Sequence, residues 1–244
     1  MIKIKNLHKS FGNKKILNGL SLTVNDGESV CIIGKSGIGK SILLKHITGL
    51  MLPDKGEVWL HDKMINSLSF KELQSIRSKI GMVFQFGALF DFMSVIENLA
   101  LPLKKLTNHS DNDIIELSEK ALEEVGLEGV GNFMPSELSG GMKKRVSIAR
   151  AIVAGPEYIL YDEPTTGLDP IMTDSINKLI KKIHIEENLT SIIVTHEMRT
   201  VYTVADRVLF LDDGAIKYDG PPSEMKNSKN KTILQFLAGS SSLT

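Results

Sequence analysis

The segment GKSGIGKS, residues 34–41, matches the pattern G-x-x-x-x-G-K-[ST] of a phosphate-binding loop, or P-loop. It follows the apolar run SVCIIG, which predicts a buried strand, and its end opens KSILLKHITGL, whose spacing predicts a helix ending at Gly49. Glycines in this loop let backbone N–H groups surround phosphate oxygens, and the N-terminus of the helix adds positive potential. This strand–loop–helix context favours a phosphate-binding site over a chance Gly-rich turn.

The residues of this loop have distinct expected tasks. Lys40 has the length and the charge to reach the β- and γ-phosphates of a nucleotide, and Ser41 can ligate Mg²⁺ through its hydroxyl. The residues predicted to surround the phosphates are Gly34, Lys35, Ser36, Gly37, Gly39, Lys40, Ser41 and Ile42.

An acidic pair follows a second apolar run in the segment YILYDEP. Asp162 stands at the expected carboxyl end of that strand, the edge at which open α/β sheets bind ligands, and it is placed to hold Mg²⁺. Glu163 comes one residue later and points differently, so it can orient or deprotonate an attacking water. An ordinary acidic loop would be the default interpretation, but the P-loop upstream favours the catalytic one.

Two more polar residues end apolar runs at the same predicted sheet edge. His196 ends SIIVTH, and a neutral imidazole there can contact the γ-phosphate or position the water. Gln85 ends GMVFQ and can reach the metal ion or the water. Position alone leaves a functional and a purely structural role open for both residues.

Hydrophobic periodicity along the rest of the chain predicts a mixed α/β fold. The first 85 residues combine antiparallel strands, such as MIKIKNL and LPDKGEVWL, with the one strand–loop–helix unit. Residues 86–155 are helical in pattern, and DNDIIELSEKALEEVGL is predicted to start with an Asp cap and to stop at Gly126. The runs YILYD and SIIVTH flank a helix and predict a parallel sheet, followed by a hairpin turning at Asp213-Gly214, the amphipathic helix KTILQFLAG and a polar tail.

Composition narrows the choice of partner and compartment. The chain has 244 residues, and its net charge is zero because Lys plus Arg and Asp plus Glu are 29 each, which argues against nucleic acid as the main partner. Cys31 is the single cysteine, so an intramolecular disulfide is excluded and a reducing cytosol is favoured. The start of the chain has no signal-peptide pattern, and no apolar run approaches the roughly 20 residues of a membrane helix. Any link to a membrane is therefore expected to pass through another protein.

The motifs taken together resemble a known family. The P-loop, FQ, LSGG, YDEP, GLD and VTH occur in the order typical of ATP-binding cassette (ABC) proteins, and the resemblance extends to about Gly220. It implies a P-loop NTPase (RecA-like) α/β core with an antiparallel β subdomain and an inserted α-helical subdomain. The expected division is a single nucleotide-binding domain over 1–222, with a core of 1–85 and 156–222 and a helical subdomain of 86–155, and a C-terminal helix and tail over 223–244.

The resemblance also implies ATP and Mg²⁺ as ligands and assigns roles by position. The implied catalytic residues are Glu163 as base, His196 as the switch histidine and Gln85 of the Q-loop. The metal ligands implied are Ser41, Gln85 and Asp162. The remaining nucleotide contacts are implied for Phe11, which stacks on adenine, the signature residues Ser139, Gly140 and Gly141, and the D-loop residue Asp169.

Within this family, the chain is similar to the ATPase of Mla-type (Mce-linked) phospholipid transporters. That group carries the segment FQ-x-GALF-x-x-MSV-x-EN and a Met after LSGG, as this chain does in FQFGALFDFMSVIEN and LSGGMKKR. Met142 replaces the Gln of most ABC relatives, and Phe11 stands where Tyr is common. Neither difference removes a phosphate-binding group.

The leading hypothesis is an ATPase subunit that powers a membrane transporter for phospholipid. The resemblance implies a homodimer, an integral membrane permease bound near the Q-loop and the helical subdomain, further Mla-type subunits, and a peripheral position at the cytoplasmic face of the inner (plasma) membrane. The alternatives are the ABC ATPase of another transporter class, or a soluble ABC ATPase acting on nucleic acid or ribosomes. A small-molecule kinase would leave LSGG and Glu163 unexplained.

Three segments lead to further expectations. The LSGG turn is expected to face away from its own P-loop and to cap the ATP of a second subunit in a head-to-tail dimer. The segment FGALFDFMSVIENLALPL is interpreted as mostly subdomain core, with a groove for a permease helix. The basic run MKKR is interpreted as a solvated helix face near phosphate rather than a nucleic-acid site.

Overall fold

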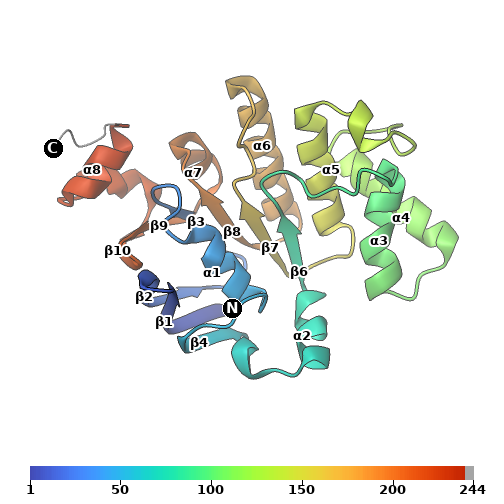
Figure 1. Ribbon diagram of the computed structural model, residues 1–244. Coiled ribbons are helices and arrows are strands. Elements are labelled where there is room, and N and C mark those ends of the chain that lie inside the picture. The colour runs from blue at the N-terminus through green and yellow to red at the C-terminus, as the bar shows by residue number, and fades with distance from the viewer. Residues whose placement is uncertain (240–244) are drawn as a thin grey trace.

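The computed structural model describes residues 1–239, and within this range the strands form two sheets (Figure 1). In that part of the chain, a four-stranded antiparallel sheet has the order β2-β1-β4-β5 and a six-stranded sheet has the order β10-β9-β3-β8-β7-β6. The larger sheet is parallel except for β10, which pairs antiparallel with β9. The strands are β1 (Ile2–Phe11), β2 (Lys14–Val24), β3 (Ser29–Ile33), β4 (Lys55–Leu60), β5 (Lys63–Met64), β6 (Ile80–Val83), β7 (Tyr158–Asp162), β8 (Thr190–Thr195), β9 (Arg207–Asp212) and β10 (Ala215–Gly220).

The helices lie on both faces of the larger sheet and at both of its ends (Figure 1). They are α1 (Lys40–Ile47), α2 (Phe70–Arg77), α3 (Val95–Leu106), α4 (Asp111–Glu124), α5 (Gly140–Ile152), α6 (Pro170–Glu186), α7 (Met198–Val204) and α8 (Lys231–Leu237). Short 3-10 turns cover Ile65–Ser67, Pro135–Glu137 and Pro222–Asn227. This arrangement confirms the predicted mixed α/β fold with an antiparallel sheet and an inserted group of helices.

Two helix starts differ from the sequence prediction. Within residues 1–85 the sequence predicted a single helix, which is α1. Helix α2 in the same region was missed, although a capping box marks the start of α2. The Ser69 side chain accepts a hydrogen bond from the Glu72 N–H, and Glu72 accepts one from the Ser69 N–H at 2.9 Å. Helix α4 is capped by Ser110 and not by an aspartate, because Ser110 and Asp113 form the same reciprocal pair.

Side chains of the larger sheet alternate between two hydrophobic cores. Val30 and Ile32 of β3 face α1 and the antiparallel sheet, whereas Cys31 and Ile33 face α6 and α7. Helix α1 is therefore packed between the two sheets, and its N-terminus lies at the carboxyl end of β3 (Figure 1). Cys31 is fully buried, as predicted, and burial raises the pKa of its thiol.

The inserted helices and the C-terminal helix extend the second core in opposite directions. Leu122 of α4 and Val146 of α5 belong to the same cluster of buried side chains as the sheet. At the other end of the molecule, Ile233 of α8 is buried and the Phe236 ring lies 5.2 Å from the ring of Phe210 (Figure 1). The expected polar tail lies largely in residues 240–244, outside the described residues.

The predicted hairpin at Asp213-Gly214 is confirmed. Both residues have positive φ, 47° and 70°, as the two-residue turn of an antiparallel hairpin requires. Within residues 1–239, none of the helices has the length and apolar character needed to cross a membrane.

Candidate active site

The P-loop connects β3 to α1. Two of its positions accept only glycine, because neighbouring atoms leave no room for a side chain there. Gly34 and Gly39 have φ of 152° and 112°, values that residues with a Cβ rarely adopt. A Cβ on Gly34 would lie 2.4 Å from the Leu211 carbonyl oxygen, and one on Gly39 would lie 2.7 Å from Cγ2 of Ile16. The loop therefore keeps its curvature, and with it the inward orientation of its N–H groups, only with glycine at both positions.

Lys40 begins α1 and folds back over the loop. Its Nζ donates hydrogen bonds to the carbonyl oxygens of Gly34, at 2.9 Å, and Lys35, at 3.2 Å. The side chain is only 5% exposed, and burial lowers the pKa of the ammonium, while the nearby charge of Glu163 opposes that shift. A buried ammonium held at the centre of an N–H-lined loop is positioned to bind anionic phosphate oxygens.

Ser41 and Asp162 meet although 121 residues separate them in sequence. The Ser41 hydroxyl donates to Oδ1 of Asp162 at 2.7 Å, so the first turn of α1 contacts the carboxyl end of β7. Burial raises the pKa of Asp162, and the hydrogen bond from Ser41 opposes that shift. A hydroxyl and a carboxylate oxygen side by side are the donor types that Mg²⁺ prefers, so the two residues fit the predicted metal site.

Glu163 has a backbone conformation different from that of the strand it follows. Its φ is 52°, a left-handed value that costs a non-glycine residue on the order of 1 kcal/mol and that turns its side chain away from that of Asp162. Its Oε1 lies 3.7 Å from the Lys40 Nζ. Its Oε2 accepts a hydrogen bond from the Thr166 hydroxyl at 3.2 Å and lies 2.7 Å from Nδ1 of His196. The carboxylate is thus held in one position by partners from three segments.

A cavity of about 270 Å³ lies against the P-loop and brings several predicted residues together. Gln85, just beyond the end of β6, and His196, just beyond the end of β8, both line it. The strands are slightly shorter than the sequence analysis placed them, and these polar residues project from the turns that follow. The lining residues are Ser36, Gly37, Gly39, Lys40, Ser41, Ile42, Gln85, Glu163 and His196.

Phe11 and Asp169 are not among the residues that line this cavity. Phe11 lies at the tip of the β1–β2 hairpin, is 48% exposed, and has the Lys9 Nζ at 5.7 Å from its ring centroid. Its ring is therefore accessible to a planar ligand. Asp169 is the N-cap of α6 and accepts hydrogen bonds at 2.9 Å from the N–H groups of Ile171 and Met172.

The signature turn (Ser139–Gly141) also lies outside the P-loop cavity, at the N-terminus of α5. Ser139 is the N-cap and accepts a hydrogen bond from the Met142 N–H at 3.3 Å. Gly141 faces the side chain of Met172 on α6, whose flexible end lies closest to it. Gly140, the first residue of the helix, is exposed, whereas Gly141 is buried, and the first N–H groups of any helix lack partners within the helix itself.

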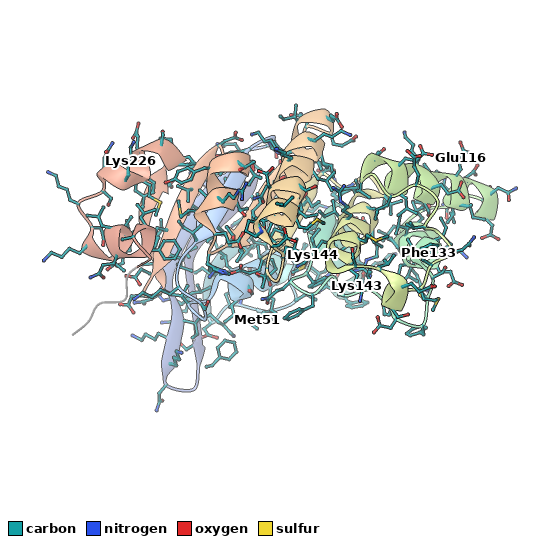
Figure 2. All side chains as sticks on the ribbon, turned by 90° about the horizontal axis from the view of Figure 1, so that it is seen from above. Met51, Glu116, Phe133, Lys143, Lys144 and Lys226 are labelled. Carbon is teal, nitrogen blue, oxygen red and sulfur yellow. The ribbon has the colours of Figure 1, made fainter. Side chains whose placement is uncertain are left out.

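The interpretation of MKKR as a solvated face is wrong for its inner residues. Lys144 is only 6% exposed, and its Nζ donates to the Gln85 carbonyl oxygen. Arg145 donates to Ser175 Oγ at 2.7 Å. The run points inward because α5 lies between α6 and the other inserted helices (Figure 2). Sequence reasoning missed Lys144 and Thr166, since neither stands at the end of an apolar run.

The aromatic segment after Gln85 is also less buried than predicted. Phe86 and Phe92 are 87% and 76% exposed, whereas Val95 at the start of α3 is fully buried. A second cavity, of about 460 Å³, lies beside this segment between β6, α3 and α5. Its lining is largely apolar and includes Phe84, Phe90, Leu101, Pro102 and Leu106, with Lys105 and Arg150 as the charged members.

Comparison with known proteins places these features in context. A family model described as ABC transporter matches residues 17–166. The chloroplastic protein TRIGALACTOSYLDIACYLGLYCEROL 3 of Arabidopsis thaliana is 43% identical over 98% of this chain and 74% of its own length. The intermembrane phospholipid transport system ATP-binding protein MlaF of Haemophilus influenzae is 41% identical over 99% of this chain and 91% of its own length. An L-cystine import ATP-binding protein of Bacillus subtilis is 42% identical over 97% of this chain and 92% of its own length.

Solved structures agree with these sequence matches. A dimeric ATP-binding cassette in a post-hydrolysis state, bound to ADP and phosphate, superimposes with a TM-score of 0.84 at 35% identity. The match covers 91% of this chain and 99% of that one. The protein cbiO1 of Clostridium perfringens, part of the ABC transporter complex cbiONQ, gives a TM-score of 0.85 at 31% identity, covering 93% of this chain and 91% of that one.

Proposed function

The chain belongs to the ABC transporter family, as an ATP-binding and ATP-hydrolysing subunit of a transporter, and from that premise we propose that it powers the movement of phospholipid. One relative, named for intermembrane phospholipid transport, supports this cargo directly, and another, named for the galactolipid trigalactosyldiacylglycerol, supports a lipid cargo in general. The cystine importer is similarly identical, so a transporter of another class is the second candidate. The neutral net charge disfavours action on nucleic acid.

The position of the Glu163 carboxylate supports ATP hydrolysis best. Lys40 binds the β- and γ-phosphates, and Glu163, 3.7 Å from its ammonium, faces the space next to them. In this position Glu163 accepts a proton from the water that attacks the γ-phosphate, and His196 holds the carboxylate through the 2.7 Å contact. The products are ADP and phosphate.

The other site residues position the nucleotide. Ser41 and Asp162, with Gln85 facing the same space, would hold Mg²⁺, which neutralises developing negative charge on the phosphates when it is bound. The exposed ring of Phe11 would stack on adenine. Asp169 at the start of α6 would lie at the contact between two cassettes.

ABC cassettes act as dimers, and we assign the signature turn to the nucleotide of the partner subunit. In this chain the turn is absent from the walls of the P-loop cavity, yet its serine and glycines present helix N-terminal N–H groups as a P-loop does. A twofold dimer would place the turn of each subunit over the γ-phosphate bound by the other. Each chain would then need both anion-binding turns, because each turn serves a different nucleotide.

Mixing two inactive variants tests this composite site. We expect Lys40→Ala and Ser139→Arg each to abolish ATP-driven dimerisation. In a mixed dimer one site carries both changes and the other carries neither. ATP-driven dimerisation of an equal mixture, measured by light scattering, should therefore return to about half of the wild-type level, because about half of the random pairings are mixed. A site formed within one chain predicts no recovery at all, and that result, with both variants shown to be folded by circular dichroism, would refute the assignment.

The second cavity is the surface to which we assign the permease. Its apolar walls fit an amphipathic helix, and the neighbouring exposed rings of Phe90 and Phe92, with centroids 5.7 Å apart, enlarge the apolar surface. The Gln85 segment (residues 84–90) contributes to both this cavity and the P-loop cavity. Movement at the nucleotide can therefore reach the permease through a short stretch of backbone. By the family relationship, the subunit would sit peripherally at the cytoplasmic face of the inner (plasma) membrane, with further Mla-type subunits in the complex.

Isolation of the complex from native membranes tests both the docking surface and the cargo. We expect the tagged protein to retain an integral membrane permease and bound phospholipid, identified by mass spectrometry. Phe92→Asp should reduce permease recovery by about tenfold, because a charge replaces an exposed apolar anchor, while ATP affinity stays unchanged. Ile185→Asp, at an apolar position on α6 that is 64% exposed against 76% for Phe92, is the matched control.

A permease recovered equally with Phe92→Asp would contradict the docking surface. Recovery of an amino-acid permease without phospholipid would favour the second candidate. The division into a catalytic core of 1–85 and 156–222, a helical subdomain of 86–155 and a C-terminal part from 223 remains a proposal, and limited proteolysis at these boundaries would test it.

A further inference from the structure

One face of α5 holds the backbone of the Gln85 segment. Lys144 donates from its Nζ to the Gln85 carbonyl oxygen, and Ser147 donates from its hydroxyl to the Gly87 carbonyl oxygen at 3.1 Å. A spacing of three residues places both side chains on the same face of a helix. The bonded residues are about sixty positions apart in sequence. These hydrogen bonds are therefore tertiary contacts, which join α5 to the turn that follows β6.

Arg150, three residues further along α5, continues this row. Its Nη2 donates to the Gly87 carbonyl oxygen at 2.9 Å and its Nη1 to the Ala88 carbonyl oxygen at 2.8 Å. From the opposite side, the buried Asn98 of α3 accepts from the Phe90 N–H at 2.9 Å. Three carbonyl groups of this segment, those of Gln85, Gly87 and Ala88, are thus paired with α5 and not left to water.

Lys144 is unusual in this row because a buried lysine normally needs a compensating partner. It is 6% exposed, and burial lowers the pKa of its ammonium while the charge of Glu163 opposes that shift. Figure 2 labels Lys144 and its neighbour Lys143, which is only partly buried, on the same helix. The hydrogen bond to the Gln85 carbonyl offsets part of the burial of Lys144, and a charged donor makes it a strong one.

The row connects three places that the proposed function uses. The N-terminus of α5 carries the signature turn, Gln85 lines the P-loop cavity, and Ala88 and Arg150 line the second cavity. Because Lys144 lies one turn from the signature turn, it is the member of the row that joins that turn to Gln85 most directly. A shift of α5 is therefore passed to the Gln85 peptide through a charge-assisted hydrogen bond.

We propose that Lys144 is a positioning residue for Gln85, which ties the Gln85 carbonyl to α5 so that Gln85 and the signature turn move as one body. The proposal rests on the proposed ATPase function. It implies that Gln85 is correctly placed for hydrolysis when the signature turn is seated on a nucleotide, and it gives Lys144 an effect on turnover without any contact to ATP.

Steady-state kinetics in a double-mutant cycle test the proposal. Lys144→Met removes the donor and keeps the length of the side chain, so we expect kcat to fall about tenfold, the factor for one charge-assisted hydrogen bond, with KM for ATP within about twofold of wild type. In the Gln85→Ala background, Lys144→Met should change kcat by less than about twofold, because the residue acts through Gln85. Lys144→Arg, which keeps a charged donor, should restore most of the activity.

Amide hydrogen exchange in the nucleotide-free protein gives a readout that does not depend on turnover. The Gly87 N–H donates to the Phe84 carbonyl oxygen at 2.9 Å inside the tethered segment. Lys144→Met should accelerate its exchange about tenfold by freeing the adjacent peptide, while amides of α6 keep their wild-type rates. The matched control is Lys143→Met, the same substitution on the neighbouring residue, for which both kcat and exchange should match wild type.

Several results would overturn the proposal. The first is an equal fall in kcat when Lys144→Met is introduced into the wild type and into Gln85→Ala. The second is a Lys144→Met variant in which only KM changes, and the third is an unchanged exchange rate of the Gly87 N–H in that variant. Should Lys144→Met fail to fold, Lys144→Gln, which keeps a shorter and uncharged donor, replaces it in the same cycle. A wild-type protein without ATPase activity would refute the proposed function instead, and the exchange comparison would still decide whether the tether exists.

Discussion

Replacing Glu163 by glutamine is expected to lower kcat for ATP hydrolysis by about 10²- to 10⁴-fold, the contribution typical of a general base. Glutamine keeps the shape of the side chain and can still contact Thr166 and His196, but it cannot take a proton from water. The affinity for ATP should stay within about threefold of wild type, since the phosphate contacts come from the P-loop. Protein with ATP bound should therefore accumulate, and size-exclusion chromatography with ATP should show a stable dimer.

Glu197→Gln is the matched control for this prediction. The Glu197 carboxylate lies near the same strand end and accepts a hydrogen bond from the Thr165 hydroxyl at 2.8 Å, a contact that a glutamine oxygen can keep. Its kcat should stay within about twofold of wild type, the range of a surface substitution without a special role. Glu163→Gln with at least a tenth of the wild-type kcat would show that another group accepts the proton.

Replacing Lys40 by alanine is expected to weaken ATP binding by about 100-fold or more. The ammonium is buried at the centre of the P-loop, and its loss removes charge-assisted hydrogen bonds to two phosphates, each contributing about 1.5–3 kcal/mol. Titration calorimetry with a non-hydrolysable ATP analogue measures this loss directly. Because the change acts on binding, it should also prevent ATP-driven dimerisation, which Glu163→Gln should enhance.

Lys45→Ala provides the control for the Lys40 prediction. Lys45 is on the same helix, α1, but its side chain is exposed. Removal of the Lys45 side chain should change the affinity for ATP by no more than about threefold. A solvent-exposed charge that does not touch the nucleotide is screened by water and salt and contributes little to binding. Unchanged affinity in Lys40→Ala would mean that the loop does not bind phosphate through this lysine, and the site assignment would need to be rebuilt from Ser41 and the backbone.

Local signals in the sequence were sufficient to predict most of the fold. The continuous apolar run SVCIIG predicted a buried strand, and the structure divides the residues of β3 between two cores. The Asp213-Gly214 hairpin was predictable because its two positive φ values favour that residue pair. The start of α2 was missed although Ser69 and Glu72 mark it, because a short helix without a strong apolar stripe gives a weak periodic signal.

Several residues that meet at the P-loop cavity could be singled out from the sequence, because Gln85, Glu163 and His196 follow apolar runs and Lys40 and Ser41 belong to a motif with a known mechanism, whereas Lys144 and Thr166 were missed. Their geometry was not predictable. The pairing of Ser41 with Asp162 and the contacts of Glu163 with Lys40 and His196 depend on the order of strands in the sheet. Strand order follows from the packing of distant segments, which no local pattern encodes.

The sequence by itself thus determined the elements of this protein and the chemistry at their ends, because backbone preferences and side-chain periodicity act over a few residues. Only the tertiary structure decided which charged and aromatic side chains are buried. MKKR is polar in sequence, yet Lys144 is buried against the Gln85 carbonyl, whereas the apolar Phe86 and Phe92 are exposed. Burial depends on what surrounds a helix or a loop in three dimensions, and at these positions neighbouring elements supply a carbonyl partner for the lysine and leave the two rings exposed.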